Sequence, residues 1–250
     1  MIRQLAAAVA FLTRVPVLSR MAFDAKDVGR SARWFPLIGL IIGGALVAAL
    51  QLFNYVFPPL VTAFLIAAID ALLTGALHLD GLADTADGFG GGRTRQDVLR
   101  IMRDHAIGSY GAIALVLVIA IKATALAALI QRYRAPQFLA LMPMLGRWSI
   151  VLLSATQPYA RSDQEGAPPG GAVSAFVGRV ELIVASTIAL PAAFVLASWR
   201  GLLAALWVLA ASGCWGWYCR RRIGGITGDT LGASVEISET LVVLFALVES

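Results

Sequence analysis

Charged residues are scarce in this sequence: Asp, Glu, Lys and Arg make up 14% of its 250 residues, against about 25% in average soluble proteins. Hydrophobic residues account for 59%, and the mean hydropathy is +0.79. So little charge excludes an ordinary soluble enzyme and indicates an integral membrane protein. The net charge of +5 follows from the topology of such a protein, as shown below, so we expect no nucleic acid among its partners.

Cysteine is equally rare. The two cysteines, Cys214 and Cys219, lie five residues apart in an apolar stretch, which excludes a disulfide framework and a zinc-binding pattern. We interpret both as packing residues. The N-terminal segment has no pattern of a cleavable signal, because its apolar run is short, is interrupted by Arg14 and lacks a small-residue cleavage site. We expect an amphipathic helix at the membrane interface there.

Long apolar runs dominate the rest of the chain. A bilayer core about 30 Å thick needs roughly 20 apolar residues per helix. The junctions at 57–60 and 199–201 are so short that the spans they join should be antiparallel neighbours. A seventh segment, 231–249, is apolar only in its second half. The sequence therefore predicts an all-α, polytopic membrane helix bundle that forms one catalytic domain over residues 1–250, with six clear spans at 36–57, 60–79, 108–131, 136–156, 180–199 and 201–219.

The positive charges orient this bundle. Of the 20 Lys and Arg residues, fifteen fall in the N-terminal segment and the long polar connections that follow the second, fourth and sixth spans. Three, Arg132, Arg134 and Arg200, fall on the opposite side, and two lie within spans. Because cytoplasmic loops carry excess Lys and Arg, we expect a cytoplasmic (inner) membrane protein whose long polar loops, and whose active site, face the cytoplasm.

The stretch HLDGLADTADGFGGGR, residues 78–93, carries the first candidate site. Asp80, Asp84 and Asp87 are spaced i, i+4, i+7, so a helix through them places three carboxylates on one face. Such a stripe is either a solvated acidic helix end or a site for a hard cation, and we favour Mg²⁺ bound by these three residues. The glycines that follow, including Gly90 and Gly91, free backbone N–H groups for a large anionic ligand.

Arginines follow this motif. Arg93 can meet a phosphate with its planar guanidinium. Arg95, Asp97 and Arg100 are more simply read as surface charges. Asp104, before the sequence IGSYG at the mouth of the next span, is a better candidate for a catalytic or metal-binding role.

A second polar cluster, residues 220–240, repeats this chemistry. It combines paired glycines, among them Gly225, with Asp229 and Glu236 on the start of the last helix. Ionised Glu is costly within a spanning helix and is usually functional there. Either these acids face the same cavity as the first motif, which we favour, or the last helix is only interfacial. Within the spans, Arg147 can contact phosphate or one of the acids, and Asp70 and Lys122 can pair with each other.

These motifs together carry a resemblance. The strings HLDGLADTADGFGGG, LRIMRDHAIGSYGAIAL, FLTRVPV, FPLIGLIIG, PMLGRW and GGITGDTLGASVEISE, in order from about residue 11 to residue 240, resemble the cobalamin synthase family, the adenosylcobinamide-GDP ribazoletransferases (CobS/CobV). His105 departs from the family pattern, which has small residues there, and we assign it no role.

The resemblance implies a membrane enzyme that uses Mg²⁺ to join adenosylcobinamide-GDP to α-ribazole or its 5′-phosphate and releases GMP. It also makes a complex with other enzymes of nucleotide-loop assembly plausible, and the sequence leaves a homo-oligomer open. In this scheme Asp80, Asp84 and Asp87 bind Mg²⁺, and Asp104 and Glu236 are the candidates for the base that takes the hydroxyl proton. The expected substrate-binding residues are His78, Gly90, Gly91, Arg93, Arg147, Gly225 and Asp229.

Two other functions fit parts of the pattern. The CDP-alcohol phosphatidyltransferases share an Asp-x-x-Asp-Gly core, which Asp84, Asp87 and Gly88 match, but the rest of their motif is absent. A cation-coupled secondary transporter also uses intramembrane acids. Transporter sites lie near the midplane, however, whereas both acidic clusters here lie at the expected cytoplasmic ends of spans.

Overall fold

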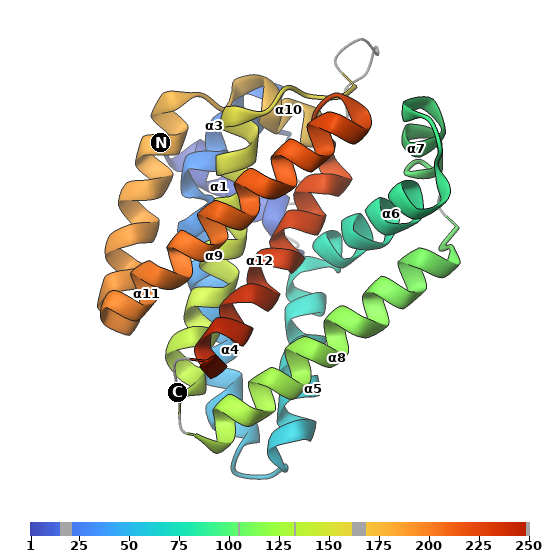
Figure 1. Cartoon of the computed structure of the whole chain (residues 1–250). Helices are drawn as coiled ribbons and strands as arrows, with labels where there is room; N and C mark the ends of the chain where they lie inside the picture. The colour runs from blue at the N-terminus through green and yellow to red at the C-terminus, as the bar shows by residue number, and fades with distance from the viewer. Residues whose placement is uncertain (16–21, 105, 133, 162–168, 249–250) are drawn as a thin grey trace.

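A computed structural model describes residues 1–15, 22–104, 106–132, 134–161 and 169–248 of the chain (Figure 1). The described residues form an all-α bundle with no named strand; the one isolated bridge joins Tyr159 and Ile226. The elements are α1 (Ile2–Leu12), α3 (Ala25–Ser31), η1 (Ala32–Trp34), α4 (Phe35–Phe53), α5 (Pro59–Thr74), α6 (Leu77–Gly91), α7 (Arg95–Ile101), α8 (Ser109–Gln131), α9 (Ala135–Thr156), α10 (Pro169–Phe176), α11 (Arg179–Ile223) and α12 (Gly228–Val248).

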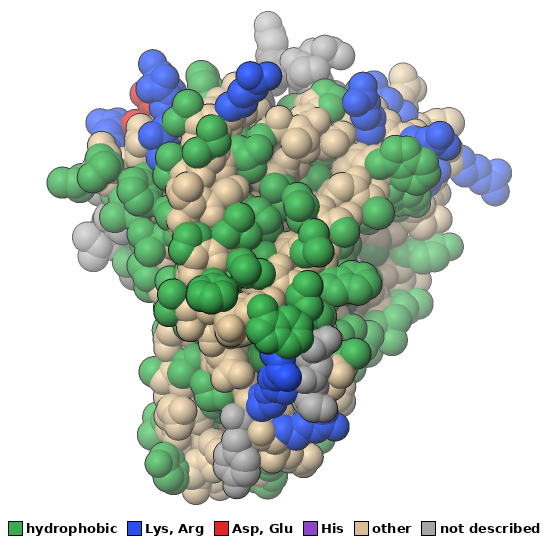
Figure 2. All heavy atoms as spheres, turned by 60° about the vertical axis from the view of Figure 1, so that its left-hand side comes forward, with side chains coloured by type: hydrophobic (Ala, Val, Ile, Leu, Met, Phe, Trp, Pro, Cys, Tyr) green, Lys and Arg blue, Asp and Glu red, His purple; other side chains and the backbone are tan. Residues whose placement is uncertain are grey.

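Helix α9 is the centre of the bundle. Nearly all of its residues are buried, and α4, α11 and α12 pack around it. The outer helices instead expose large apolar side chains, such as Val116 on α8 at 67% and Val195 on α11 at 82%. Figure 2 shows hydrophobic side chains over the middle of one face, with Lys and Arg gathered at one end and a smaller group toward the other. This distribution is that of a multi-pass membrane protein.

The spans agree with the sequence in number and kind. Five helices are long and apolar enough to cross a membrane, or six when the bent pair α5–α6 counts as one span. One of the five, α11, has 45 residues and would be about 68 Å long if straight. It is broken by non-helical backbone at Ala197 and Ser198, and its two arms fold back as a hairpin in Figure 1. These arms are the predicted spans 180–199 and 201–219.

The predicted span 60–79 is wrong in its last five residues. Helix α5 ends at Thr74, and α6 leaves it at 93°. The bend lies at Gly75 and Ala76, which both have left-handed backbone, with φ of 64° and 56°. A side chain at Gly75 would also collide with that of Arg14, so glycine suits this corner on two grounds. The acidic stretch is therefore helical, as predicted, but it forms a separate helix across the end of α5.

The polar connections gather at one end of the molecule. Helices α3, α7 and α10 and the turn between α11 and α12 lie at the upper end in Figure 1, whereas the α4–α5 and α8–α9 turns and the C-terminus lie at the lower end. The N-terminal helix α1 forms as expected and buries one face, including Leu12, against the bundle, with Phe11 stacked on Phe35 at 5.5 Å between ring centroids.

Candidate active site

The two acidic motifs meet where α6 crosses α12. A methyl group at Gly81 would lie 2.8 Å from the carbonyl oxygen of Asp229 and 3.1 Å from the Cα of Gly232. The helices therefore touch through their backbones, which only glycine permits at this distance. Residues about 150 positions apart in sequence thus share one place in the fold, and the last helix is part of the bundle core rather than a separate interfacial helix.

A cavity of about 220 Å³ lies beside this crossing, and we call it the acidic pocket. Its polar lining comes from His78 and Asp80 on α6, Asp229 at the start of α12, and Arg161 in the α9–α10 connection. Arg161 Nη2 donates to Asp229 Oδ2 at 3.0 Å. His78 is buried, and its Nε2 has no hydrogen-bond partner among the described residues. The pocket thus combines two carboxylates, an arginine and an imidazole nitrogen available to a ligand.

The start of α12 is fixed by its own threonines. The backbone N–H of Thr227 donates to the hydroxyl of Thr230 at 2.8 Å, and the N–H of Thr230 donates to the hydroxyl of Thr227 at 3.2 Å. This reciprocal capping satisfies N–H groups that a helix N-terminus leaves free. The Thr227 hydroxyl also lies 3.3 Å from Asp229 Oδ2, so the carboxylate is held at the pocket wall.

The three-carboxylate metal site expected on α6 does not assemble. Within the described ranges, no three His, Cys, Asp or Glu side chains converge as metal ligands do. Asp80 is exposed and lines the acidic pocket, where its charge interacts with that of Asp229. Asp84 is half-buried. The spacing i, i+4, i+7 puts successive carboxylates about one turn apart along the helix axis, so Asp80 and Asp87 lie about two turns apart and face different neighbours.

Asp87 instead caps helix α8. Its two oxygens accept hydrogen bonds from the backbone N–H of Gly108 at 2.7 Å and of Gly111 at 2.9 Å. A helix N-terminus leaves such N–H groups unpaired and favours a negative charge nearby. A Cβ at either glycine would collide with the Asp87 carboxylate, which explains the sequence GSYG at this point. The structure thus gives Asp87 a structural task that its spacing did not reveal.

Glu236 lies away from the acidic pocket, in a buried ion cluster with Asp70, Lys122, Arg147 and Glu239. The Lys122 ammonium lies 3.0 Å from Glu236 Oε2 and 2.5 Å from Glu239 Oε2. The predicted direct pair of Asp70 with Lys122 is replaced by these two contacts. They border a second, mostly apolar cavity of about 270 Å³ between α5, α8 and α12.

Arg147 is completely buried and forms an ion pair with Glu239. Its Nη2 also lies 3.9 Å from Asp70 Oδ1 and 3.4 Å from His78 Nδ1. Of the two partners expected for Arg147, an acid or a phosphate, the structure supplies the acid. Through His78, this arginine connects the ion cluster to the wall of the acidic pocket.

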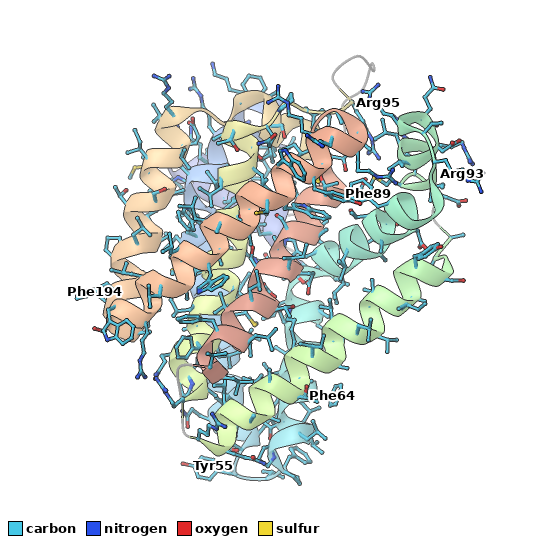
Figure 3. The ribbon with its side chains drawn as sticks, in the orientation of Figure 1. Tyr55, Phe64, Phe89, Arg93, Arg95 and Phe194 are labelled. Atoms are coloured by element: carbon cyan, nitrogen blue, oxygen red, sulfur yellow. The ribbon has the colours of Figure 1, made fainter. Side chains whose placement is uncertain are left out.

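The other predicted site residues lie outside the acidic pocket. Arg93 is exposed on the outer side of the α6–α7 turn (Figure 3). Asp104 is exposed and accepts a hydrogen bond from the Ala106 N–H at 3.2 Å. The predicted glycines pack against other groups instead of forming an open loop: Gly90 against the Tyr110 ring, Gly91 near Ile101 and Gly225 against the Pro158 carbonyl. His105 lies outside the described residues.

No motif or spacing in the sequence indicated a functional role for Arg161. It counted only as one of the cytoplasmic-side charges, because it lies in an irregular connection with no periodicity. In the structure it also lines a further cavity of about 380 Å³, together with Arg95, Arg100 and Arg103. We call this the arginine cavity.

Two ionisable side chains near this cavity have shifted pKa values. Burial raises the pKa of Tyr159, and the nearby Arg161 charge opposes this shift. Hydrogen bonds from Thr94 lower the pKa of Asp97, and the same two residues form the capping box that begins α7.

Comparison with known proteins identifies the family of this chain. Residues 4–247 match the family model described as cobalamin-5-phosphate synthase. The chain is 42% identical to the adenosylcobinamide-GDP ribazoletransferase of Chlorobaculum tepidum over 252 residues, which cover 98% of this chain and 95% of the relative. It is 39% identical to the protein of that name from Klebsiella pneumoniae, with 99% and 100% covered, and 42% identical to that from Rhizobium etli, with 94% and 92% covered. No solved structure matches the chain.

Proposed function

Because this chain belongs to the cobalamin-5-phosphate synthase family, we propose that it joins adenosylcobinamide-GDP to α-ribazole or α-ribazole 5′-phosphate and releases GMP. The product is adenosylcobalamin or its 5′-phosphate. The single observation in the fold that carries this proposal is the acidic pocket, where the two motifs typical of the family come together at the Gly81–Asp229 contact.

The reaction is a phosphoryl transfer. A ribose hydroxyl of α-ribazole forms a bond to the phosphorus on the cobinamide side of the diphosphate, and the bond from that phosphorus to the bridging oxygen breaks. The hydroxyl proton is released, and negative charge develops on the leaving GMP. No covalent enzyme intermediate is needed, so the protein has mainly to align the two substrates and stabilise charge.

The pocket supplies groups for both tasks. Arg161 can donate two parallel hydrogen bonds to phosphate oxygens. His78 Nε2 can donate a hydrogen bond to a substrate oxygen. Arg147, which has only donors, lies 3.4 Å from Nδ1, so Nε2 carries the ring proton, and Nε2 is buried at the pocket with no partner among the described residues. Asp104 and Glu236, the acids expected to act as the base, do not line this pocket. Asp104 is exposed, and Glu236 forms an ion pair with Lys122.

Mg²⁺ fits this pocket as a cofactor. Asp80 and Asp229 are two carboxylates at one cavity, and Mg²⁺ is commonly held by one or two carboxylates with waters and substrate phosphates completing its shell. When bound, it would neutralise charge developing on the phosphate oxygens. Asp229 thus joins Asp80 in the ligand set that we propose.

The pocket is also proposed to open toward the cytoplasm of a bacterial inner membrane. It lies toward the end of the bundle that carries most of the arginines, which is the cytoplasmic end under the positive-inside rule. Adenosylcobinamide-GDP and α-ribazole would then reach the pocket from the cytoplasm. Contact with other enzymes of nucleotide-loop assembly, and a homo-oligomer, remain predictions.

The test is a reaction with purified protein in neutral detergent. We expect adenosylcobinamide-GDP and α-ribazole to give a corrinoid product and GMP with no ion gradient present, and Asp80→Asn and Asp229→Asn each to lower the rate at least 100-fold. Gly44→Ala, at a position whose added methyl meets no atom within 4 Å, is the matched control. Turnover only with a CDP-activated lipid, or none without a gradient, would favour a phosphatidyltransferase or a transporter instead.

A further inference from the structure

The arginine cavity concentrates positive charge at one end of the bundle. Arg95 and Arg100 come from α7, Arg103 from the turn after it, and Arg161 from the α9–α10 connection. Asp97 offsets part of this charge through an exposed contact of 3.9 Å with Arg100, and Asp229 pairs with Arg161 at 3.0 Å. Four guanidinium groups around about 380 Å³ form a site of the charge and size that phosphate groups require.

One arginine of the cavity has a buried N–H group with no partner among the described residues, which distinguishes this site from an ordinary charged surface. Arg161 is 7% exposed, and its Nε has no hydrogen-bond partner among the described residues. The Tyr159 hydroxyl is also buried, which raises its pKa, and it lies close enough to Arg161 and Arg103 for their charges to oppose this increase. Leaving a buried donor unpaired costs free energy, so an acceptor that fits beside it would be bound favourably.

The cavity is also built on a fixed frame. Arg95 Nε donates to the Ile223 carbonyl at 2.8 Å, and its Nη2 donates to the Ala160 carbonyl at 2.7 Å. These bonds attach the start of α7 to the end of α11 and to the connection that carries Arg161. In Figure 3, Arg95 lies near the end of α11, in contrast to Arg93 on the outer side of the turn.

Arg161 belongs to both cavities. It lines the acidic pocket, where it pairs with Asp229, and it lines the arginine cavity. A molecule with two linked phosphates could therefore place one phosphate among the arginines and the other beside Asp80 and Asp229. The shared arginine would then lie near the bridging oxygen, the atom on which charge develops when the diphosphate is cleaved.

We infer that the arginine cavity binds the guanosine monophosphate half of the diphosphate substrate, with Arg161 at the diphosphate and Arg103 on the departing phosphate. This assignment rests on the proposed function and adds to it the site of the leaving group. Gln96 and Leu99 also line the cavity and offer an amide and an apolar surface to the base.

Binding of GDP and GMP to the purified full-length protein, measured by calorimetry in neutral detergent without corrinoid or α-ribazole, tests the assignment. We expect Arg161→Gln and Arg103→Gln each to weaken GDP binding at least tenfold, and Arg93→Gln, at an exposed arginine outside the cavity, to change it less than twofold. Arg103→Gln removes an exposed side chain, so it separates ligand binding from folding. It should also raise KM for adenosylcobinamide-GDP while KM for α-ribazole stays constant.

Three outcomes of these experiments lead to different conclusions. If GDP binds equally well to all variants, the assignment is wrong even when the protein makes the corrinoid product. If GDP binding depends on Arg103 and Arg161 but no product forms, the nucleotide site stands and the proposed reaction fails. If phosphatidylglycerol in nanodiscs, or inorganic phosphate, binds with the same dependence on Arg103 while GDP does not, the cavity holds a lipid headgroup or free phosphate and the inference is overturned.

Discussion

Gly81 on α6 and Gly232 on α12 lie in direct backbone contact, with the position of a Gly81 methyl 3.1 Å from the Cα of Gly232. This contact joins the two acidic motifs and sets the width of the acidic pocket. Gly81→Ala should therefore separate the helices, lower stability by about 1–3 kcal/mol and reduce turnover at least tenfold. Thermal unfolding in detergent and a product assay measure both effects. Gly44→Ala should leave stability and turnover unchanged. If Gly81→Ala also left them unchanged, the crossing of α6 and α12 would tolerate a wider separation.

Asp80 and Asp229 should act as one unit. If they hold the same Mg²⁺, the double variant Asp80→Asn with Asp229→Asn loses much less than the product of the two single losses, because the first substitution already disables the site. Removing Mg²⁺ with a chelator should abolish turnover, and added Mg²⁺ should restore it. The double variant Asp80→Asn with Glu236→Gln is the control, because these two acids lie apart, and its loss of rate should equal the product of the two single losses. If the losses of Asp80→Asn and Asp229→Asn also multiplied, a shared metal ion would be excluded.

Asp87→Asn separates a capping role from a metal-binding role. The amide keeps one acceptor oxygen for the Gly108 and Gly111 N–H groups and loses the charge that favours the α8 N-terminus, so we expect a stability loss of about 1–2 kcal/mol. The Mg²⁺ concentration that gives half-maximal rate should change less than twofold. A tenfold or larger increase in that concentration would show that Asp87 is a metal ligand.

Lys122 stabilises two carboxylates at membrane depth. Lys122→Met should destabilise the protein by about 3–5 kcal/mol, because it leaves Glu236 and Glu239 without their shared cation in a buried site. Adding Glu236→Gln should recover part of that loss, since one uncompensated charge is then removed. Thermal unfolding in detergent gives both values. An unchanged midpoint in the single variant would mean that Arg147 alone suffices for the cluster.

Cysteine labelling tests the orientation of the bundle. In a Cys214→Ser background, a cysteine at Gln96 or Arg221 should react with a membrane-impermeant maleimide only after permeabilisation, whereas one at Tyr55 should react in intact cells. This result is expected because Gln96 and Arg221 lie at the end of the bundle that carries the excess of arginine, and such an end faces the cytoplasm. Cys219 is buried and serves as an internal negative control. Reaction of Gln96 and Arg221 from opposite sides would separate the two motifs and exclude one shared site.

The sequence by itself determined the class of fold and most of the elements. Apolar length against bilayer thickness located α4, α8 and α9, and the short 199–201 junction indicated the hairpin within α11. The span at α12 stayed open in the sequence, because segment 231–249 is apolar only in its second half. It also located both acidic motifs on helices, because these properties are local and repeat along the chain. The bend at Gly75 and Ala76 escaped detection, since apolar composition continues through it and a single glycine does not by itself end a helix.

Only the tertiary structure decided which side chains meet. The rotation of α6 about its axis brings Gly81 against α12 and Asp87 against the start of α8, so Asp80 and Asp87 have different neighbours although the sequence spacing puts them on one face. Lys122 met Glu236 and Glu239, over a hundred residues away, instead of Asp70. Arg161 has no periodic neighbours that could have predicted its place between the two cavities. Hydropathy and spacing specify where helices run, whereas contacts between distant helices depend on how their surfaces pack together.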